Sequence, residues 1–190
     1  MISIIERVEK TETIEFTDSG SGGIERSTPP LHFTAWPGSN LCRAWRVTAL
    51  DLYRAIFQFQ KPNAIVSCSK VEFYVDLNTS QPANLPTVSE IYIQNFSGVL
   101  DGSAEYLSGT LMRDTAGGWT DGTWYDLSDQ GGDPTTYALI GTPIVIKIVA
   151  TCAVNDAGQF YNSVKDRCRL RLTYQYLKKA QGSGPNGYAV

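Results

Sequence analysis

Apolar and polar residues alternate along the last long segment of the chain. Residues 168–176, CRLRLTYQY, carry apolar or aromatic side chains at every second position and polar or basic ones between them. A period of two is typical of a strand with one buried face and one solvated face. Residues 71–77, VEFYVDL, repeat the pattern, with Glu72, Tyr74 and Asp76 on the second face. Both segments are predicted to be half-buried strands.

Further strands follow from apolar runs and from the turns between them. Residues 143–151, PIVIKIVAT, are almost uniformly apolar and β-branched, which favours a central strand covered on both faces. Residues 43–57 can also be read as about four turns of helix, but strands are preferred there. Eight or more short strands predict an all-β fold, a jelly-roll β-sandwich with extended N- and C-terminal arms. The other candidate strands are 31–36, 43–50, 53–60, 89–96, 104–112 and a short one around TWYDL.

The two ends of the chain differ in composition from the middle. Residues 18–30, DSGSGGIERSTPP, are typical of a flexible connection, and the QGSGPNGYAV sequence at the C-terminus has no core-forming capacity. We therefore expect an N-terminal arm and linker over 1–30, a jelly-roll sandwich over 31–178, and a C-terminal tail over 179–190.

Charge and composition narrow the classes of partner. Sixteen basic residues against nineteen acidic ones leave a net charge of -3, without a basic run that would neutralise a phosphate backbone. We expect neither nucleic acid nor a membrane as a partner. Charges at Glu6, Arg7, Glu9 and Lys10 interrupt any apolar run near the N-terminus, so no signal peptide is expected and the chain should be made in the cytoplasm. The four cysteines have no paired spacing and are predicted to be free thiols in the core.

Catalytic machinery is not indicated. Nucleophilic hydrolysis needs a histidine base, and the single histidine, His32, lies in an apolar strand context. A carboxylate pair, Asp114 with Asp121 or Asp126 with Asp133, is what a glycosidase would use, but aspartates beside glycines are above all loop formers. The protein is predicted not to be an enzyme and to need no cofactor and no metal.

The stretch GGWTDGTWYDLSDQGGD, residues 117–133, is the strongest candidate for a ligand site. Sugar rings stack on flat aromatic side chains while carboxylates accept hydrogen bonds from the hydroxyls. The candidate carbohydrate-binding residues are Trp119, Trp124 and Tyr125 as platforms, with Asp121 and Asp126 as acceptors. The alternative is a structural loop in which a tryptophan closes the end of the sandwich and the aspartates cap turns. A calcium site at Asp121, Asp129 and Asp133 stays open, although the spacing matches no dedicated calcium loop.

Several segments resemble DNRLRE-type jelly-roll domains. Residues 53–77 pair an arginine-led strand containing Arg54, Phe57 and Phe59 with a turn at Pro62 and a second strand. Residues 117–124 lie where such domains carry a tryptophan-containing turn, and residues 160–174, FYNSVKDRCRLRLTY, look like their closing segment, although the six-residue motif that names the family is absent. The resemblance implies a sandwich related to carbohydrate-binding modules, a type that occurs in extracellular bacterial proteins and in phage virion proteins.

Two functions follow as hypotheses. The first is a non-enzymatic bacteriophage virion protein, a capsid decoration, cement or tail-associated component located in the virion. It would contact other virion proteins and copies of itself, for instance as a trimer, because arms that order on binding give large contact surfaces to a modest domain. The alternative is a carbohydrate-binding module or a receptor-binding protein for a host glycan. The candidate assembly contacts are Ile2, Ile4 and Ile5 in a strand added to a neighbour, and Tyr188 and Val190 at the C-terminus.

Overall fold

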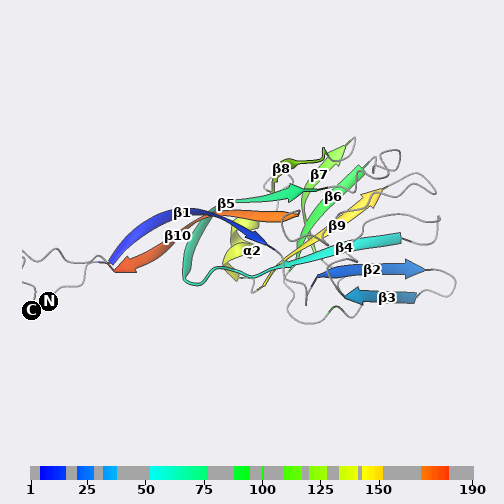
Figure 1. Cartoon of the computed structure of the whole chain (residues 1–190), viewed down its shortest axis with the longest axis horizontal. Helices are drawn as coiled ribbons and strands as arrows, with labels where there is room; N and C mark the ends of the chain where they lie inside the picture. The colour runs from blue at the N-terminus through cyan, green and yellow to red at the C-terminus, as the bar shows by residue number, and fades with distance from the viewer. Residues whose placement is uncertain are drawn as a thin grey trace, which may run out of the picture.

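The computed structural model of the chain describes residues 5–15, 21–27, 32–37, 52–76, 88–94, 100, 109–116, 120–127, 133–140, 143–151 and 168–179. These residues form two antiparallel sheets (Figure 1). The four-stranded sheet has the order β1-β10-β5-β8, and the six-stranded sheet has the order β3-β2-β4-β9-β6-β7. The strands of the first sheet are β1 (Ile5–Glu15), β10 (Arg169–Lys179), β5 (Ile65–Val75) and β8 (Thr123–Asp126). Those of the second are β3 (His32–Pro37), β2 (Gly22–Ser27), β4 (Leu52–Phe59), β9 (Ile144–Thr151), β6 (Val88–Gln94) and β7 (Thr110–Ala116).

The strand pairing is that of a jelly roll. Eight strands form four nested antiparallel pairs, β1 with β10, β4 with β9, β5 with β8 and β6 with β7. Nested pairs arise when one long antiparallel ribbon wraps around a core, and the β5–β10 and β6–β9 pairs then join the ribbon into two sheets. The β2–β3 hairpin is an insertion that extends the six-stranded sheet beyond β4. The predicted all-β sandwich is confirmed.

The core lies between the two sheets and follows the period of two. Phe57 and Phe59 of β4 face Phe73 of β5, with ring centroids 5.6 and 6.3 Å from that of Phe73. Alternate residues of β9 and β10, such as Ile146 and Leu172, are fully buried in the same cluster. Such aromatic and aliphatic burial is the main stabilising contribution in a domain of this size.

Three strand predictions are confirmed closely. Segment 168–176 is β10, segment 71–77 is the second half of a longer β5, and segment 143–151 is β9. β9 is central, between β4 and β6, and its residues 144–148 are buried on both faces, as its composition predicted. Strands were also expected at the places of β3, β4, β6 and β8, whereas segment 43–50 lies outside the described residues.

Other boundaries need correction. The strand expected at 104–112 overlaps β7, which begins at Thr110, and residues 104–108 lie outside the described residues. Residues 1–30 were expected to be arm and linker, yet β1 pairs along its whole length with β10, and β2 pairs with both β3 and β4. Both strands therefore belong to the sandwich.

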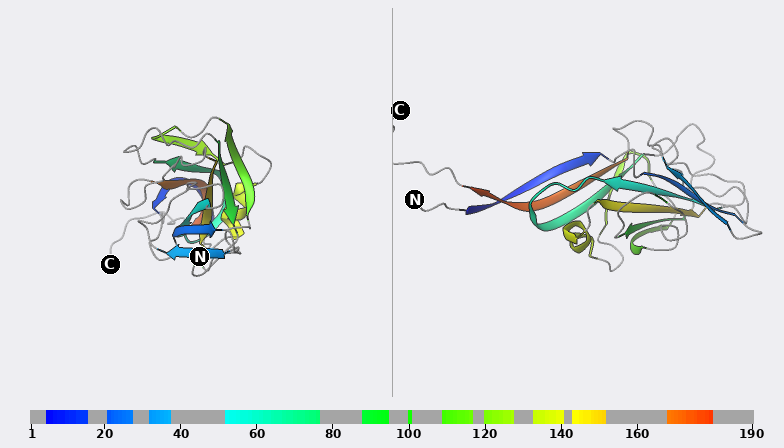
Figure 2. Two further views of the ribbon diagram at one scale, coloured as in Figure 1. Left: turned by 90° about the vertical axis from the view of Figure 1, so that its right-hand side faces the viewer. Right: turned by 90° about the horizontal axis from the view of Figure 1, so that it is seen from below.

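One element, helix α2 (Pro134–Ile140), was not predicted. The Thr135 backbone N–H donates to the Asp133 carboxylate at 3.0 Å, so Asp133 caps the first turn. Proline at the first helical position needs no backbone donor, which suits it to that place. The helix packs against β5 through the buried Ala138 (Figure 2).

Two of the four cysteines lie in the described residues. Cys68 and Cys168 are free thiols and are buried, as predicted. Cys42 and Cys152 lie outside the described residues. Burial raises the pKa of the Cys68 thiol, which keeps it in the protonated, unreactive form.

β1 and β10 extend beyond the sandwich as a two-stranded ribbon (Figures 1 and 2). β5 accompanies β10 only as far as the Ile65–Tyr176 pair, so Leu177, Lys178 and Lys179 pair with β1 alone. Every residue of β1 is exposed or half-exposed. The ribbon thus leaves the core and carries both ends of the described chain to one end of the molecule.

Candidate functional site

On the face of the four-stranded sheet turned away from the core, charged and aromatic side chains of β10, β5 and β8 lie in rows across the strands. The registers of β10 with β5 and of β5 with β8 place Arg169, Tyr74 and Trp124 in one row across the sheet. Because side chains alternate between faces, the next row on the same face is two residues along each strand. That row consists of Arg171, Glu72 and Asp126. Together with Lys70 and Thr173, these rows form the outer face of the four-stranded sheet.

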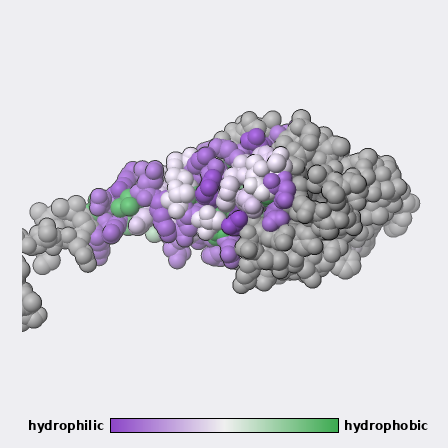
Figure 3. Space-filling model, turned by 45° about the horizontal axis from the view of Figure 1, so that its top comes forward, coloured by the Kyte–Doolittle hydropathy of each residue, from purple (hydrophilic) through white to green (hydrophobic). Residues whose placement is uncertain are grey.

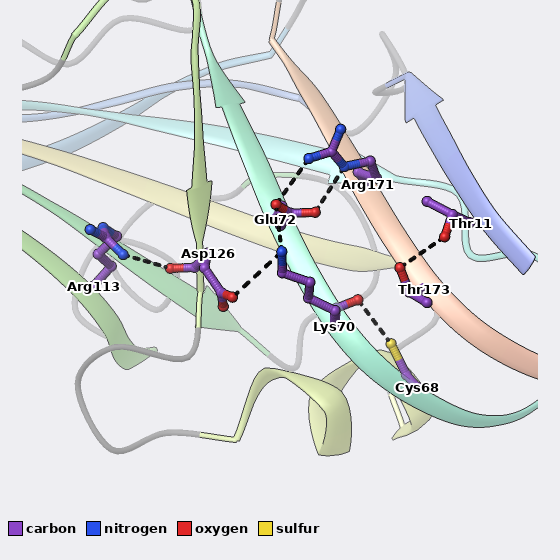
Figure 4. Close-up of polar contacts among 8 residues, drawn as sticks. All are labelled: Thr11, Cys68, Lys70, Glu72, Arg113, Asp126, Arg171 and Thr173. Carbon is purple, nitrogen blue, oxygen red and sulfur yellow. Dashed lines mark hydrogen bonds and ion pairs between the residues drawn. The ribbon is translucent and has the colours of Figure 1, made fainter.

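Glu72 is at the centre of an ion-pair network on this face (Figure 4). Its carboxylate accepts hydrogen bonds from Nε and Nη2 of Arg171 at 2.8 and 2.9 Å, and from Nζ of Lys70 at 2.9 Å. Lys70 also lies 3.9 Å from the carboxylate of Asp126. The bonds from Arg171 lower the pKa of Glu72, although burial opposes them. Two-point contact by a guanidinium is a strong, directional interaction that holds β10 and β5 in register.

Cations cover the aromatic rings of the neighbouring row. The guanidinium of Arg171 lies 4.2 Å from the centroid of the Trp124 ring, and that of Arg169 lies 4.6 Å from the Tyr74 ring. The Tyr74 and Trp124 rings are tilted by 55° with centroids 5.2 Å apart. Contacts between cations and aromatic rings at these distances are attractive. The outer face therefore combines charged and aromatic side chains in direct contact.

The structure separates the predicted sugar-binding residues. Trp124 and Asp126 lie on the outer face, but Tyr125, between them in sequence, points into the core and is only 8% exposed. Its hydroxyl accepts a hydrogen bond from the Thr120 backbone N–H at 2.7 Å. Tyr125 therefore cannot be a stacking platform, which corrects that expectation. Asp121 is exposed in the turn before β8, and Trp119 lies outside the described residues.

Sequence reasoning missed four members of this face, namely Glu72, Tyr74, Arg169 and Arg171. The signal was present, since the period of two already placed each of them opposite the buried side chains of its strand. What was lacking was the register between β10, β5 and β8, which decides that the four residues are neighbours.

The β1–β10 ribbon is the second distinctive surface. Tyr174 donates a hydrogen bond from its hydroxyl to Glu12 at 2.7 Å, and Lys10 donates to the same carboxylate at 3.0 Å. The bond from Tyr174 is the main cause that lowers the pKa of Glu12. On the other side of the ribbon, the hydroxyls of Thr11 and Thr173 are 3.0 Å apart. The Glu12–Tyr174 and Thr11–Thr173 contacts tie β1 to β10 at the edge of the sandwich, where Tyr174 is still buried in the core cluster.

The ribbon is largely hydrophilic, with an apolar patch near its free end (Figure 3). Ile5 is 60% exposed and Leu177 is 49% exposed. Ile5 is the only predicted assembly contact within the described residues, because Ile2, Ile4, Tyr188 and Val190 lie outside them. The N-terminal strand was expected to add to a neighbouring protein, but one side of β1 is already occupied by β10 of the same chain. Only its other side is left for such a contact.

A buried polar group lies on the far side of the six-stranded sheet from the core. Lys147 of β9 is 1% exposed, and its ammonium lies 4.6 Å from the ring of Tyr92 on β6. Tyr92 donates a hydrogen bond to Glu90 at 2.9 Å. Burial lowers the pKa of Lys147 to about 8, helped by the nearby charge of Arg54, and burial raises the pKa of Tyr92 to about 12. The burial of Lys147 shows that β9 is covered on this face as well as on the face toward the core.

The described residues show neither a candidate metal site nor a membrane-spanning helix. Within the described ranges, no group of three or more histidine, cysteine, aspartate or glutamate residues could hold a metal ion. None of the described helices is long and apolar enough to cross a membrane. No family model matches the chain, and no curated protein matches it either. The resemblance to DNRLRE-type domains stays a prediction.

Proposed function

We propose that the chain is a non-enzymatic structural protein of a bacteriophage virion, a capsid decoration, cement or tail-associated component that works through protein–protein contacts. The observation that carries the proposal is the β1–β10 ribbon, which extends past the sandwich with its end exposed. The part of the ribbon beyond the sandwich receives little stabilisation from burial in the core. Its open strand edge, with the exposed apolar side chains of Ile5 and Leu177 nearby, suits contact with another protein.

The fold is compatible with this role without deciding it. Jelly rolls occur in viral capsid proteins, in lectins and in cupins, so the architecture alone leaves several functions open. The ribbon favours assembly among them, because it offers main-chain hydrogen-bonding groups that a ligand pocket inside a sandwich would not need.

The direct test is whether the chain is part of a particle. Particles released by cells that carry the encoding genome would be purified on a density gradient, washed in high salt and analysed for peptides of this chain. The expected result is that the chain stays with the particles in a fixed ratio to the major capsid protein. Recovery of the chain only from the soluble fraction, with none in washed particles, would overturn the proposal.

A carbohydrate-binding role is the second candidate, because Tyr74 and Trp124 lie side by side on the outer face with Glu72 and Asp126 beside them. Aromatic rings beside carboxylates are the groups that sugar binding uses. The expected result on a glycan array is binding by the wild-type chain that Trp124→Ala abolishes and that Lys10→Ala, on the ribbon, leaves unchanged. No binding by the wild-type chain above background would contradict this candidate.

A further inference from the structure

The free side of β1 is a long, open strand edge. β1 pairs with β10 through all eleven of its residues, and it is the outermost strand of the four-stranded sheet. No strand among the described parts of the chain pairs with its other side. Its outward N–H and C=O groups are therefore available to a partner strand.

The charges of β1 suit a second copy of itself, and only in certain registers. A two-fold axis perpendicular to the sheet puts a given residue on the same face in both copies. Directly opposed residues of two antiparallel strands also share a face, so an odd-numbered residue lies opposite an odd-numbered one and an even-numbered residue opposite an even-numbered one. The two-fold axis then passes through one residue position of β1, at which the residue lies opposite its own copy. Each possible register is therefore named by this central residue. Centring it on Glu6, Arg7, Glu9, Lys10 or Glu12 places that charge opposite its own copy, which is unfavourable.

Centring on Thr11 gives the longest favourable pairing. Residues 7–15 of the two copies then face one another, with Arg7 opposite Glu15 and Lys10 opposite Glu12. Val8 lies opposite Ile14, which joins two half-buried apolar side chains. Each of these contacts occurs twice because of the symmetry. Centring on Val8 also avoids like charges but pairs only residues 5–11, and centres closer to either end of β1 overlap still less.

We propose that two copies of the chain pair β1 with β1 in antiparallel fashion around Thr11, so that their four-stranded sheets form one continuous sheet of eight strands. The Thr11–Thr173 hydroxyl pair, at 3.0 Å, would then meet its copy and form a row of threonines across the two-fold axis. Charged edge strands usually resist pairing. In β1, like charges disfavour pairing centred on any of the five charged residues named above. The register centred on Thr11 is the longest one without opposed like charges.

The pairing rests on the proposed assembly role, since it supplies one contact of that assembly. Its first test is the mass of the full-length protein by light scattering. The expected value is twice the 20.9 kDa of one chain. A monomer at the highest concentration that stays in solution would overturn the inference.

The register is tested by cross-linking. The two copies of Thr11→Cys would lie directly opposite each other, within reach of a disulfide. In the matched control, Thr13→Cys, the two cysteines would be four residues out of line, about 14 Å apart along the strands, and should not link. The wild-type chain under the same oxidation corrects for its own cysteines. A covalent dimer from Thr13→Cys, or from Val8→Cys in place of Thr11→Cys, would refute this register.

Charge reversal gives an independent test that does not depend on new cysteines. Arg7→Glu places glutamate opposite Glu15 twice, and Glu15→Arg places arginine opposite Arg7 twice, so each variant alone should raise the dissociation constant about tenfold or more. In a mixed dimer of the two variants, every opposed pair is again of opposite charge. The mixture should therefore dimerise as the wild type does. If the mixture dissociates as easily as each variant alone, the proposed pairing is wrong.

These outcomes separate the inference from the proposed function. A monomeric chain that is nevertheless found in washed particles would overturn the β1–β1 pairing and leave the assembly role intact. A stable dimer that is never found in washed particles would support the β1–β1 pairing and overturn the proposed role in a virion.

Discussion

At the scale of single residues, Glu72 accepts hydrogen bonds from both Arg171 and Lys70 on the outer face of the four-stranded sheet. Replacing it by glutamine should lower the free energy of unfolding at neutral pH by about 2 kcal/mol, because the negative charge is lost and one acceptor oxygen becomes an NH2 group, which cannot accept a hydrogen bond from Arg171 or Lys70. Denaturant unfolding of Glu72→Gln beside the wild type measures this. The control is Glu9→Gln on the exposed face of β1, which should change stability by less than about 0.5 kcal/mol.

The same variant has a pH signature with a definite sign. The pKa of Glu72 is below its ordinary value of 4.5 in the folded state, so its contribution is complete above 4.5 and is lost as the pH falls through the folded pKa. The wild type should therefore lose more stability than Glu72→Gln over that acid range. If the free energy of unfolding fell equally with acid pH in the two proteins, the Arg171 contact would not lower the pKa of the Glu72 carboxyl.

Lys147 should behave in the opposite way. Its pKa falls from 10.5 to about 8 on folding, so between these values the unfolded chain holds the proton that the folded chain has released. Stability then rises with pH from about 8 to 10.5. The charged groups that influence the pKa of Lys147 are Arg54 of β4 and Glu90 of β6. Tyr92 lies beside Lys147 and is itself influenced by Asp114 of β7.

Lys147→Met should remove this alkaline rise and should unfold at a higher denaturant concentration at pH 7, because a buried charge is replaced by an apolar side chain of similar length. Urea titrations across the alkaline range measure both effects. A Lys147→Met protein that keeps the wild-type slope would show that another group titrates there.

At the scale of elements, two turns share a left-handed backbone conformation, which is occupied by an alanine in one turn and by a glycine in the other. Ala64, just before β5, has φ of 64°, a conformation that costs an L-residue about 1 kcal/mol, so Ala64→Gly should stabilise the protein by about 0.5–1 kcal/mol. Gly122, just before β8, has φ of 71°, and a Cβ there would meet the Tyr74 hydroxyl at an ordinary 3.6 Å. Gly122→Ala should therefore cost about 1 kcal/mol through the backbone alone. Thermal unfolding of the two variants measures both effects: Ala64→Gly should raise the melting temperature and Gly122→Ala should lower it. Shifts of the same sign would contradict this prediction.

Sequence reasoning succeeded for elements whose pattern is local. β10, β5 and β9 were predictable because their side chains repeat with a period of two or are apolar throughout. β2 was missed because its two glycines suggested a flexible linker, whereas Gly22 and Gly23 are buried beside β4. There the Ser21 hydroxyl accepts a hydrogen bond from the Gln58 backbone at 3.0 Å. Helix α2 carried a usable signal, the cap Asp133 followed by Pro134, but its seven residues show no apolar stripe.

The candidate site shows where such reasoning ends. The residue types on the outer face could be assigned to that face from the sequence, but their association depends on registers between β10, β5 and β8, which are far apart in the chain. The same holds for β1. Its partner is the last strand of the chain, and nothing local in the sequence of residues 5–15 points to residues 169–179.

At the scale of the whole molecule, this pairing of the first and last strands closes the jelly roll, and it can be tested by a covalent link. Arg7 and Leu177 are directly opposed, so a disulfide in Arg7→Cys/Leu177→Cys would close nearly the whole chain into one loop. Loops of that length should stabilise the folded state by about 4 kcal/mol, relative to the reduced form of the same variant. Denaturant unfolding with and without reductant measures the gain.

The control is Arg7→Cys/Thr173→Cys, because Thr173 is opposed to Thr11 and lies four residues away from the partner of Arg7. Four residues of strand span about 14 Å, well beyond the reach of a disulfide, so no link and no gain are expected. Non-reducing electrophoresis then tells whether the Arg7→Cys/Leu177→Cys link joins residues of one chain. A monomer of increased mobility means that each chain closes its own sandwich, which leaves the free side of β1 for assembly. A covalent dimer would instead mean that β1 crosses to the β10 of a neighbour, and the ribbon would then be an exchanged element between chains.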